Sequence, residues 1–577
     1  MGAIECFLDL WRLQRGCILS AFGSGGGWER PAPVDDLPQP RVWQRGRHMT
    51  SEHEARHPMR STCCPCGCAD DGISRRTFLH GVGGVTMLGT ALSGLTWATV
   101  SAAAERDGRA GPQRRALIVK PILTYATPKP RPQTSWRSWG GIQTQQDANE
   151  EMARIQRELD ALKQRADFPV EFLKVSGVRS PEDVAKVGDL DRADVCMVYA
   201  AGGWMGIFDA IAKRSENMLF FCRHKSGPVY LWYEIISPRY LRQHTDTLKV
   251  QGVDDGDVVI DSQDELLWRL RALCGLRNTL GTRIVAVGGP GAWAQPKDVV
   301  PNKVRDKWKF DIQTLDYSEL GKLIQAARAD KSAVRRARDD AATYLRDAGV
   351  SLETKREYVE NCFLLAHVFR GVLKQADCQA ITINSCMGTI MPMSETTACL
   401  TLTLLNDSRY LAFCESDFVV IPSGVLLANI SGAPVFLNDP TYPHDGVITL
   451  AHCTAPRRMN GHDLEPARIL THFESDYGAA PKVEMRKGQM TTNIAPDFEL
   501  KRWVGLRAEI IDAPFMDVCR SQIDVRFTCD SKRLAERMPG FHWMTGYGDY
   551  LRELAYASKK VDIEFEDLTA QDAGYLA

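Results

Sequence analysis

The feature that most constrains the fold is an alternation of short apolar strands with amphipathic helices. In the first half of the chain, strands are predicted at Arg115–Lys120, Val170–Val175, Val195–Ala200 and Met218–Cys222, and a charged amphipathic helix at Asp147–Arg165. Strands separated by helices are typical of a parallel sheet whose faces are covered by those helices. This region is therefore predicted to be an α/β domain.

A second α/β region is predicted to begin at residue 283. Its strands are expected at Arg283–Val287, Ala380–Ile383, Tyr410–Phe413 and Pro434–Leu437. The loop Gly288–Gly291 follows the first of these strands, but its spacing matches neither a GxGxxG element nor a P-loop. Because a proline interrupts the glycines, a tight structural turn is favoured over a nucleotide site.

The pattern changes after Asp445. Short strands then follow one another without helices between them, at Val447–Ala451, Ala467–Thr471, Lys482–Met485, Val504–Ile511 and Gln522–Phe527, before a last amphipathic helix at Gly548–Ser558. Such a run indicates an antiparallel sheet or barrel. We therefore predict two doubly wound Rossmann-like α/β domains, over 105–282 and 283–444, followed by a C-terminal antiparallel β-barrel domain over 445–577.

The composition narrows the class of protein. Of the 577 residues 44% are hydrophobic and 25% are charged, which excludes disordered, collagenous and polytopic membrane proteins. The 71 basic and 72 acidic residues give a formal net charge of −1, so the chain has no basic surplus that would attract nucleic acid. A nucleic-acid partner is therefore not expected.

The first 104 residues are predicted to be a leader with a twin-arginine export signal. Arg75 and Arg76 precede a run, 77–104, that contains no Asp, Glu, Lys or Arg and ends in Val-Ser-Ala-Ala-Ala. This order is typical of a signal that the twin-arginine export machinery reads. We expect cleavage near Ala104 and a periplasmic or other extracytoplasmic location. A chance arginine pair beside a buried helix and an uncleaved membrane anchor are the alternatives.

The number and spacing of the cysteines are consistent with twin-arginine export. Six of the 17 lie in residues 1–68, which leaves 11 in the rest of the chain. An odd number of scattered cysteines indicates folding in a reducing compartment, and twin-arginine export carries folded proteins. The cluster Cys63–Cys68 lacks the loop that separates the two halves of a zinc site, so we interpret it as part of the leader.

Two acids of the second α/β region are candidates for a divalent-metal site. Glu415 follows the predicted strand Tyr410–Phe413, and Asp439 follows the strand Pro434–Leu437. A right-handed crossover would place these strands parallel and about 4.8 Å apart, with both acids at the carboxyl edge of the sheet. Because two carboxylates held so close repel each other, a bound cation is expected between them. Separate capping roles for the two acids are the simpler alternative.

Several segments beyond residue 283 follow one another in an informative order. They are Glu415-Ser416-Asp417, Ser431-Gly432, Val435-Phe436, Asp439, His452-Cys453, and Gly540-Phe541-His542 before Tyr547-Gly548-Asp549. This order, with 24 residues from Glu415 to Asp439, resembles the fucose/arabinose isomerase family of metal-dependent ketol isomerases. The resemblance covers most of 283–577 and is diffuse over 115–282.

The resemblance implies an aldose–ketose isomerase that acts on a fucose- or arabinose-like monosaccharide. It implies a divalent metal bound by Glu415, Asp439, His452 and His542, and oxygen-rich ligation with imidazole suits Mn²⁺ best. The metal would stabilise an enediolate, and Glu415 or Asp439 would transfer the proton as general base and then acid. A homo-oligomer is also expected.

Two alternatives stay open at this point. His452 and His542 lie among apolar residues and could be buried structural histidines, and His472 is as easily structural as functional. The competing function is that of an exported carbohydrate-binding protein that kept the isomerase fold without turnover. The presence of Glu415, Asp417 and Asp439 together favours the enzyme, because binding alone needs no pair of metal-chelating acids.

Overall fold

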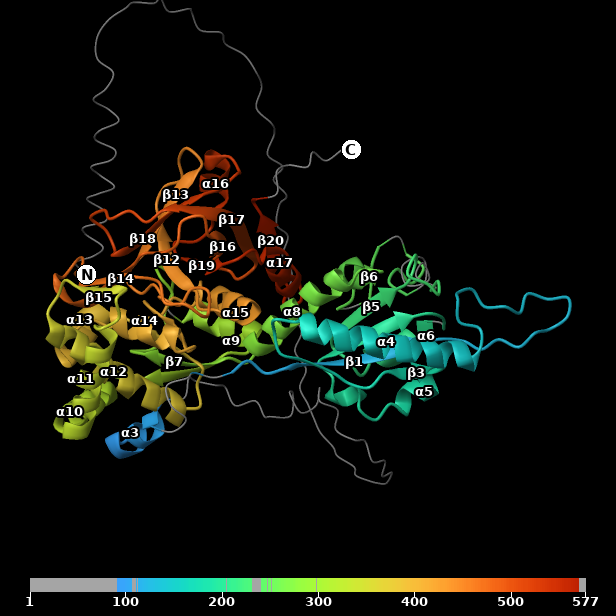
Figure 1. Cartoon of the computed structure of the whole chain (residues 1–577), viewed down its shortest axis with the longest axis horizontal. Coiled ribbons are helices and arrows are strands. Elements are labelled where there is room, and N and C mark those ends of the chain that lie inside the picture. The colour runs from blue at the N-terminus through green and yellow to red at the C-terminus, as the bar shows by residue number, and fades with distance from the viewer. Residues whose placement is uncertain are drawn as a thin grey trace, which may run out of the picture. The chain divides into compact units, whose positions relative to one another are not determined.

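The computed structural model describes residues 91–105, 111, 113–203, 205–230, 240–245, 247–250, 252–296 and 298–569. The predicted arginine pair Arg75-Arg76 and the cysteine cluster Cys63–Cys68 lie outside the described residues. The described chain is a mixed α/β structure with parallel sheets and a closed six-stranded antiparallel barrel, as the sequence predicts (Figure 1).

The first sheet is parallel throughout. Its strands, in spatial order, are β2 (Val170–Phe172), β1 (Leu117–Thr124), β4 (Val195–Ala200), β5 (Met218–Cys222) and β6 (Val258–Ile260), with β3 (Ser176–Val178) paired to the second half of β1. Helices α4 (Gln145–Arg165), α5 (Pro181–Ala185) and α6 (Met205–Ala212) lie between the strands in the sequence. Every residue of β4 and β5 is buried, as expected for strands covered on both faces.

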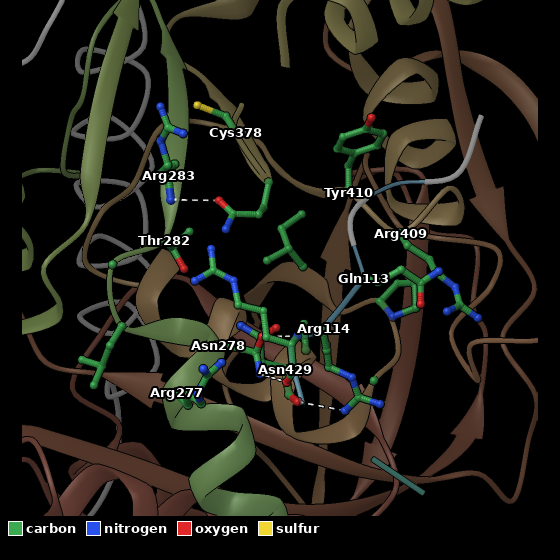
Figure 2. Close-up of a pocket in the computed structure, with 18 of the residues that line it drawn as sticks. Gln113, Arg114, Arg277, Asn278, Thr282, Arg283, Cys378, Arg409, Tyr410 and Asn429 are labelled. Carbon is green, nitrogen blue, oxygen red and sulfur yellow. Dashed lines mark hydrogen bonds between the residues drawn. The ribbon is translucent and has the colours of Figure 1, made fainter. Parts of the chain in front are cut away.

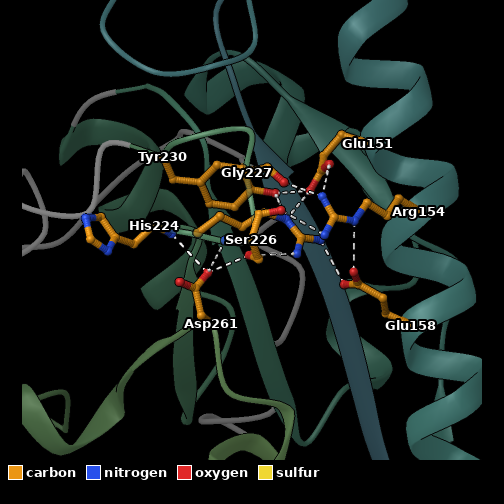
Figure 3. Close-up of polar contacts among 9 residues, drawn as sticks. Glu151, Arg154, Glu158, His224, Ser226, Gly227, Tyr230 and Asp261 are labelled. Carbon is orange, nitrogen blue, oxygen red and sulfur yellow. Dashed lines mark hydrogen bonds and ion pairs between the residues drawn. The ribbon is translucent and has the colours of Figure 1, made fainter.

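A buried ionic network joins α4 to the end of β5 (Figure 3). Arg223 follows β5, and its side chain, 1% exposed, forms ion pairs with Glu151 and Glu158 of α4. The hydroxyl of Tyr230 also donates to Glu151. Burial by itself lowers the pKa of Arg223, but the hydrogen bond with Glu158 and the nearby negative charge outweigh it and raise that pKa. Each buried charge of this network therefore has an opposite charge beside it.

The second sheet is also parallel, in the order β11 (Leu411–Phe413), β10 (Ala380–Ile383), β7 (Arg283–Val287) and β8 (Asp311–Leu315). The helices of this region are α8 (Gln263–Thr279), α9 (Val299–Trp308), α10 (Tyr317–Ala329), α11 (Lys331–Tyr344), α12 (Arg356–Gln375), α13 (Cys386–Ser394), α14 (Cys399–Asp407) and α15 (Ile421–Ser431). The strands β7 and β10 have the bounds predicted from the sequence.

The barrel closes on itself. Its strands run in the order β16 (Met490–Pro496), β19 (Trp543–Tyr547), β12 (Phe436–Pro440), β13 (Val447–His452), β18 (Ser521–Arg526) and β17 (Arg502–Asp512), and β17 pairs with β16. The strand β20 (Glu564–Asp567) adds to β17, and the helices α16 (Ser531–Arg537) and α17 (Leu551–Lys559) complete this region. The predicted strands near 467 and 482 lie outside the barrel, because β14 (Ala467–His472) and β15 (Tyr477–Val483) form a small sheet with β9 (Val350–Leu352).

The pairing predicted for the strand of Asp439 is wrong, and Asp439 lies within this strand, β12, instead of after its end. β12 does not lie beside β11; it pairs antiparallel with β13 and β19 in the barrel. The reason lies in α15, whose residues are almost all apolar and buried. Gly424 of α15 faces Met544 of β19, and on the other side Ile430 faces Gly275 of α8. Because α15 is buried between α8 and the barrel, the strand after it enters the barrel instead of returning to the sheet.

The segment at the predicted cleavage site is helical. α3 (Trp97–Glu105) packs on α12 so closely that a Cβ added at Gly371 would lie 2.2 Å from the carbonyl oxygen of Val100. Ala103 and Ala104 are buried in this contact region. Among the described residues, no helix combines the length and apolar character needed to cross a bilayer.

Candidate metal centre

Glu415 is presented by a strained turn at the end of β11. Glu415 and Ser416 have φ angles of 63° and 52°, a left-handed conformation that costs a residue other than glycine about 1–3 kcal/mol. The glycine loop after β7 holds this turn. Ser416 Oγ donates to the carbonyl of Gly289 at 3.0 Å, and the N–H of Gly291 donates to the carbonyl of Ser416 at 3.1 Å. The loop therefore supports the turn that carries Glu415.

Asp417, two residues further on, orients His542. Its Oδ2 lies 2.7 Å from Nδ1 of His542, and its Oδ1 accepts the backbone N–H groups of Trp293 at 3.2 Å and Val419 at 3.1 Å. With the Nδ1 proton of His542 donated to Asp417, Nε2 is the nitrogen left for a ligand. Metal-binding histidines are commonly held by a carboxylate in this way.

The four residues predicted from the sequence come together around this imidazole. Nε2 of His542 lies 3.3 Å from Glu415 Oε2 and 3.2 Å from Asp439 Oδ1. Nε2 of His452 lies 3.6 Å from Glu415 Oε1. One ligand atom each of Asp439, His452 and His542 lies within 4.8 Å of the other two. The two acids thus converge where the second sheet meets the barrel, and not along one sheet edge.

Three ligand atoms of this group have no hydrogen-bond partner. Asp439 Oδ1, His452 Nε2 and His542 Nε2 are buried, and apart from the ion-pair contacts within this group they form no hydrogen bond among the described residues. A buried polar atom without a partner costs about 1–3 kcal/mol, so three in one place indicate that a ligand completes the site. Carboxylate oxygen and imidazole nitrogen are suitable donors for divalent ions of the first transition row. The donor set therefore fits a divalent cation.

The electrostatics also favour a cation. Burial lowers the pKa of His452, but the nearby carboxylates of Glu415 and Asp439 outweigh it and raise that pKa to about 9. Burial likewise lowers the pKa of His542, but the hydrogen bond with Asp417 and the nearby carboxylates of Glu415 and Asp439 raise it to about 10. Burial would raise the pKa of Glu415, yet its close contacts with His452 and His542 hold it well below the usual value. The carboxylates thus dominate the local field.

The acids and the imidazoles of this group differ in exposure. The side chains of Glu415 and Asp439 are 39% and 31% exposed, whereas those of His452 and His542 are 3% and 0% exposed. An ion held here would be accessible from the carboxylate side. The ring of Trp293, 37% exposed, lies beside His542 and provides an apolar wall.

No role was predicted for Asp417 from the sequence. Its position in the Glu-x-Asp element was the feature from which a role at the site could have been predicted. Nor did the sequence predict that Cys414 forms a compact group with Glu415 and His452. His472 is not part of the carboxylate–imidazole group; it belongs to a second group with Cys399 and Cys453.

A separate cavity of about 400 Å³ is rich in arginine (Figure 2). Its lining includes Arg114, Arg115, Arg277, Arg283 and Arg409 and none of the four predicted site residues. Several of these cations already have partners: Arg114 donates to the carbonyl of Asn429 near the end of α15 at 3.0 Å, and Arg277 and Arg283 form ion pairs with aspartates. Arginines that cap a helix end and pair with acids have structural roles.

Comparison with known proteins adds no family. No model of a protein family matches the chain, and no curated protein is significantly similar to it. The function is therefore inferred from the geometry of the site and from the order of its residues along the chain.

Proposed function

We propose that this protein is a metal-dependent aldose–ketose isomerase that acts on a fucose- or arabinose-like monosaccharide. The observation that supports it most is the meeting of Glu415, Asp439, His452 and His542, with three buried ligand atoms that lack hydrogen-bond partners among the described residues. These residues occur in the order that resembles the ketol isomerases. Oxygen-rich ligation with two imidazoles makes Mn²⁺ the ion we propose.

In the proposed reaction a proton moves between two neighbouring carbons of the open-chain sugar. A bound divalent ion supplies stabilisation of the negative charge that develops on the two sugar oxygens. Glu415 or Asp439, the two carboxylates of the site, takes the proton from one carbon and returns it to the other, while the hydroxyl proton passes from one sugar oxygen to its neighbour. Asp417 keeps the His542 ring in one orientation and one tautomer. Trp293 limits access of water on its side of His542.

The proposal is tested by assaying the purified full-length chain for conversion of L-fucose and L-arabinose to their ketoses, with Mn²⁺ and after chelation. Wild-type protein should convert one of these sugars only with metal, and Glu415→Gln should lose both bound metal and turnover. Asp524→Asn is a matched control, because Asp524 is a half-buried barrel acid that accepts a hydrogen bond from Thr449 at 2.6 Å. Metal-loaded wild-type protein that binds these sugars without converting them would favour the carbohydrate-binding alternative.

We also propose a division of the α/β region into two doubly wound Rossmann-like domains, near residue 283. In support, β1 to β6 pair among themselves, and β7, β8, β10 and β11 do the same. Limited proteolysis should release fragments that divide near this residue. Light scattering of the intact protein measures its molar mass and so tests whether it is a homo-oligomer.

Export by the twin-arginine route is a further proposal. Arg75→Lys with Arg76→Lys should leave the precursor in the cytoplasm, whereas continued export would require another route. Cleavage after Ala104 would remove almost all of α3, which packs on α12. The intact mass of the exported protein therefore distinguishes a chain that begins at Glu105 from one that retains this helix.

A further inference from the structure

A second set of metal-ligand side chains adjoins the carboxylate–imidazole group but shares no residue with it. Cys399, Cys453 and His472 each place one ligand atom within 4.8 Å of the other two, and all three residues are buried. Cys519 packs against the two cysteines. The four residues come from the start of α14, the end of β13, the end of β14 and the loop before β18. Two thiols and one imidazole thus meet, and a third thiol packs against them.

We propose that Cys399, Cys453, Cys519 and His472 bind a structural zinc ion. Structural zinc is commonly held in a tetrahedron of three thiolates and one imidazole, with bonds of about 2.3 Å to sulfur and about 2.0 Å to nitrogen. Such bonds place neighbouring ligand atoms about 3.5–3.8 Å apart. The ligand atoms of Cys399, Cys453 and His472, all within 4.8 Å of one another, lie near that spacing. Cys519, which packs against the cysteine cluster, supplies the fourth ligand of the proposed site.

The surroundings of His472 agree with this role. Its Nδ1 lies 3.1 Å from Ser475 Oγ, and donation of the Nδ1 proton to this hydroxyl leaves Nε2 for the metal. A hydrogen bond at the second ring nitrogen is the usual support of a metal-binding histidine.

A disulfide explains the cluster less well. A bond between any two of Cys399, Cys453 and Cys519 would leave the third thiol buried beside an imidazole that contributes nothing to the bond. A zinc ion uses all four side chains. It would also join α14 of the second α/β region to the barrel and fix Cys453, the residue that follows His452. The inference does not depend on the proposed isomerase reaction.

The first experiment is metal analysis of the full-length protein purified without chelator. We expect one zinc ion per chain, retained in Glu415→Gln, whose substitution affects only the carboxylate–imidazole group. Cys399→Ser and His472→Asn should each weaken zinc binding at least tenfold. Cys378→Ser is the matched control, because Cys378 is equally buried and its thiol donates to the carbonyl of Ala376.

The second experiment needs no variant. Replacing zinc by Co²⁺ in the wild-type protein should produce thiolate-to-cobalt charge-transfer absorption and the strong visible bands of a tetrahedral site. Absence of these bands after saturation with Co²⁺ would overturn the proposal, as would unchanged zinc content in both Cys399→Ser and His472→Asn. A disulfide among the three cysteines, found by peptide mapping, would also overturn it. None of these measurements depends on isomerase activity.

Discussion

Arg223 and His542 are both deeply buried ionisable side chains, but their surroundings differ. Arg223 has two glutamates as ion-pair partners, and one of them also accepts the hydroxyl of Tyr230. His542 is held by Asp417 at Nδ1, whereas its Nε2 is close to two carboxylates and has no hydrogen bond among the described residues. The Arg223 network is closed, and the group around His542 is incomplete.

This difference distinguishes buried charges that stabilise the fold from buried charges that form a binding site. A closed network satisfies its own charges and rigidifies the first sheet, so removing one member leaves a buried charge without a partner. An incomplete group of carboxylates and imidazoles gains stability when protons or a metal cation bind to it. The two regions should therefore respond in opposite ways to substitution and to added metal.

The largest expected effect is on the closed network. Arg223→Met leaves Glu151, 3% exposed, with only the more distant Arg154 at 4.0 Å as a cation, and should lower the free energy of unfolding by about 3–5 kcal/mol while metal binding stays unchanged. Urea denaturation of the metal-free protein measures this change. Arg165→Met is the control, because Arg165 and Asp264 form an exposed ion pair whose loss should cost less than about 1 kcal/mol. Equal losses of unfolding free energy in the two variants would contradict the proposed difference between the buried network and an exposed ion pair.

The second prediction concerns His542→Gln. At a free Mn²⁺ concentration of 100 times Kd, the wild-type protein should gain about 2.7 kcal/mol of stability, and the variant should lose most of this gain. Thermal melting against Mn²⁺ concentration measures it. His367→Gln on α12, a half-buried histidine outside the site, is the control. A metal-induced shift as large in His542→Gln as in the wild type would exclude His542 as a ligand.

A smaller effect is expected for Asp417, which touches His542 and is proposed only to position it. Asp417→Asn keeps the size of the side chain but weakens the hold on the imidazole, so metal affinity should fall 10- to 100-fold, or about 1.4–2.7 kcal/mol. Calorimetric titration with Mn²⁺ measures the change. Unchanged affinity would mean that the surrounding packing alone orients His542.

The last prediction concerns the sign of the pH dependence of stability in the metal-free protein. The pKa values of His452 and His542 are raised to about 9 and about 10, above the unfolded value of about 6.5. The native state therefore binds more protons, and its extra stability is complete below about pH 6.5 and disappears as the pH rises through 9 to 10. Added Mn²⁺ should reverse the trend, because the metal competes with these protons. Unfolding curves across this range, with and without metal, test both signs.

The sequence predicted the buried parallel strands well. β4, β5, β7 and β10 have the predicted bounds, because a continuous apolar run between helical patterns allows few other structures. The strand β16 was missed because it contains Thr491, Thr492 and Asn493. These residues are buried in the barrel, where Thr491 donates to the carbonyl of Ala508 at 2.9 Å and Asn493 to that of Leu506 at 3.1 Å.

By itself, the sequence determined the alternation of strands and helices, the change to a barrel and the positions of the four candidate ligands, because these are local patterns and orders along one chain. Only the tertiary structure decided that β12 belongs to the barrel and that Asp417 holds His542, 125 residues away. It alone also brought Cys399, Cys453 and His472 together. Such contacts depend on how α15 is buried and on how the barrel strands are paired, and no local pattern specifies either.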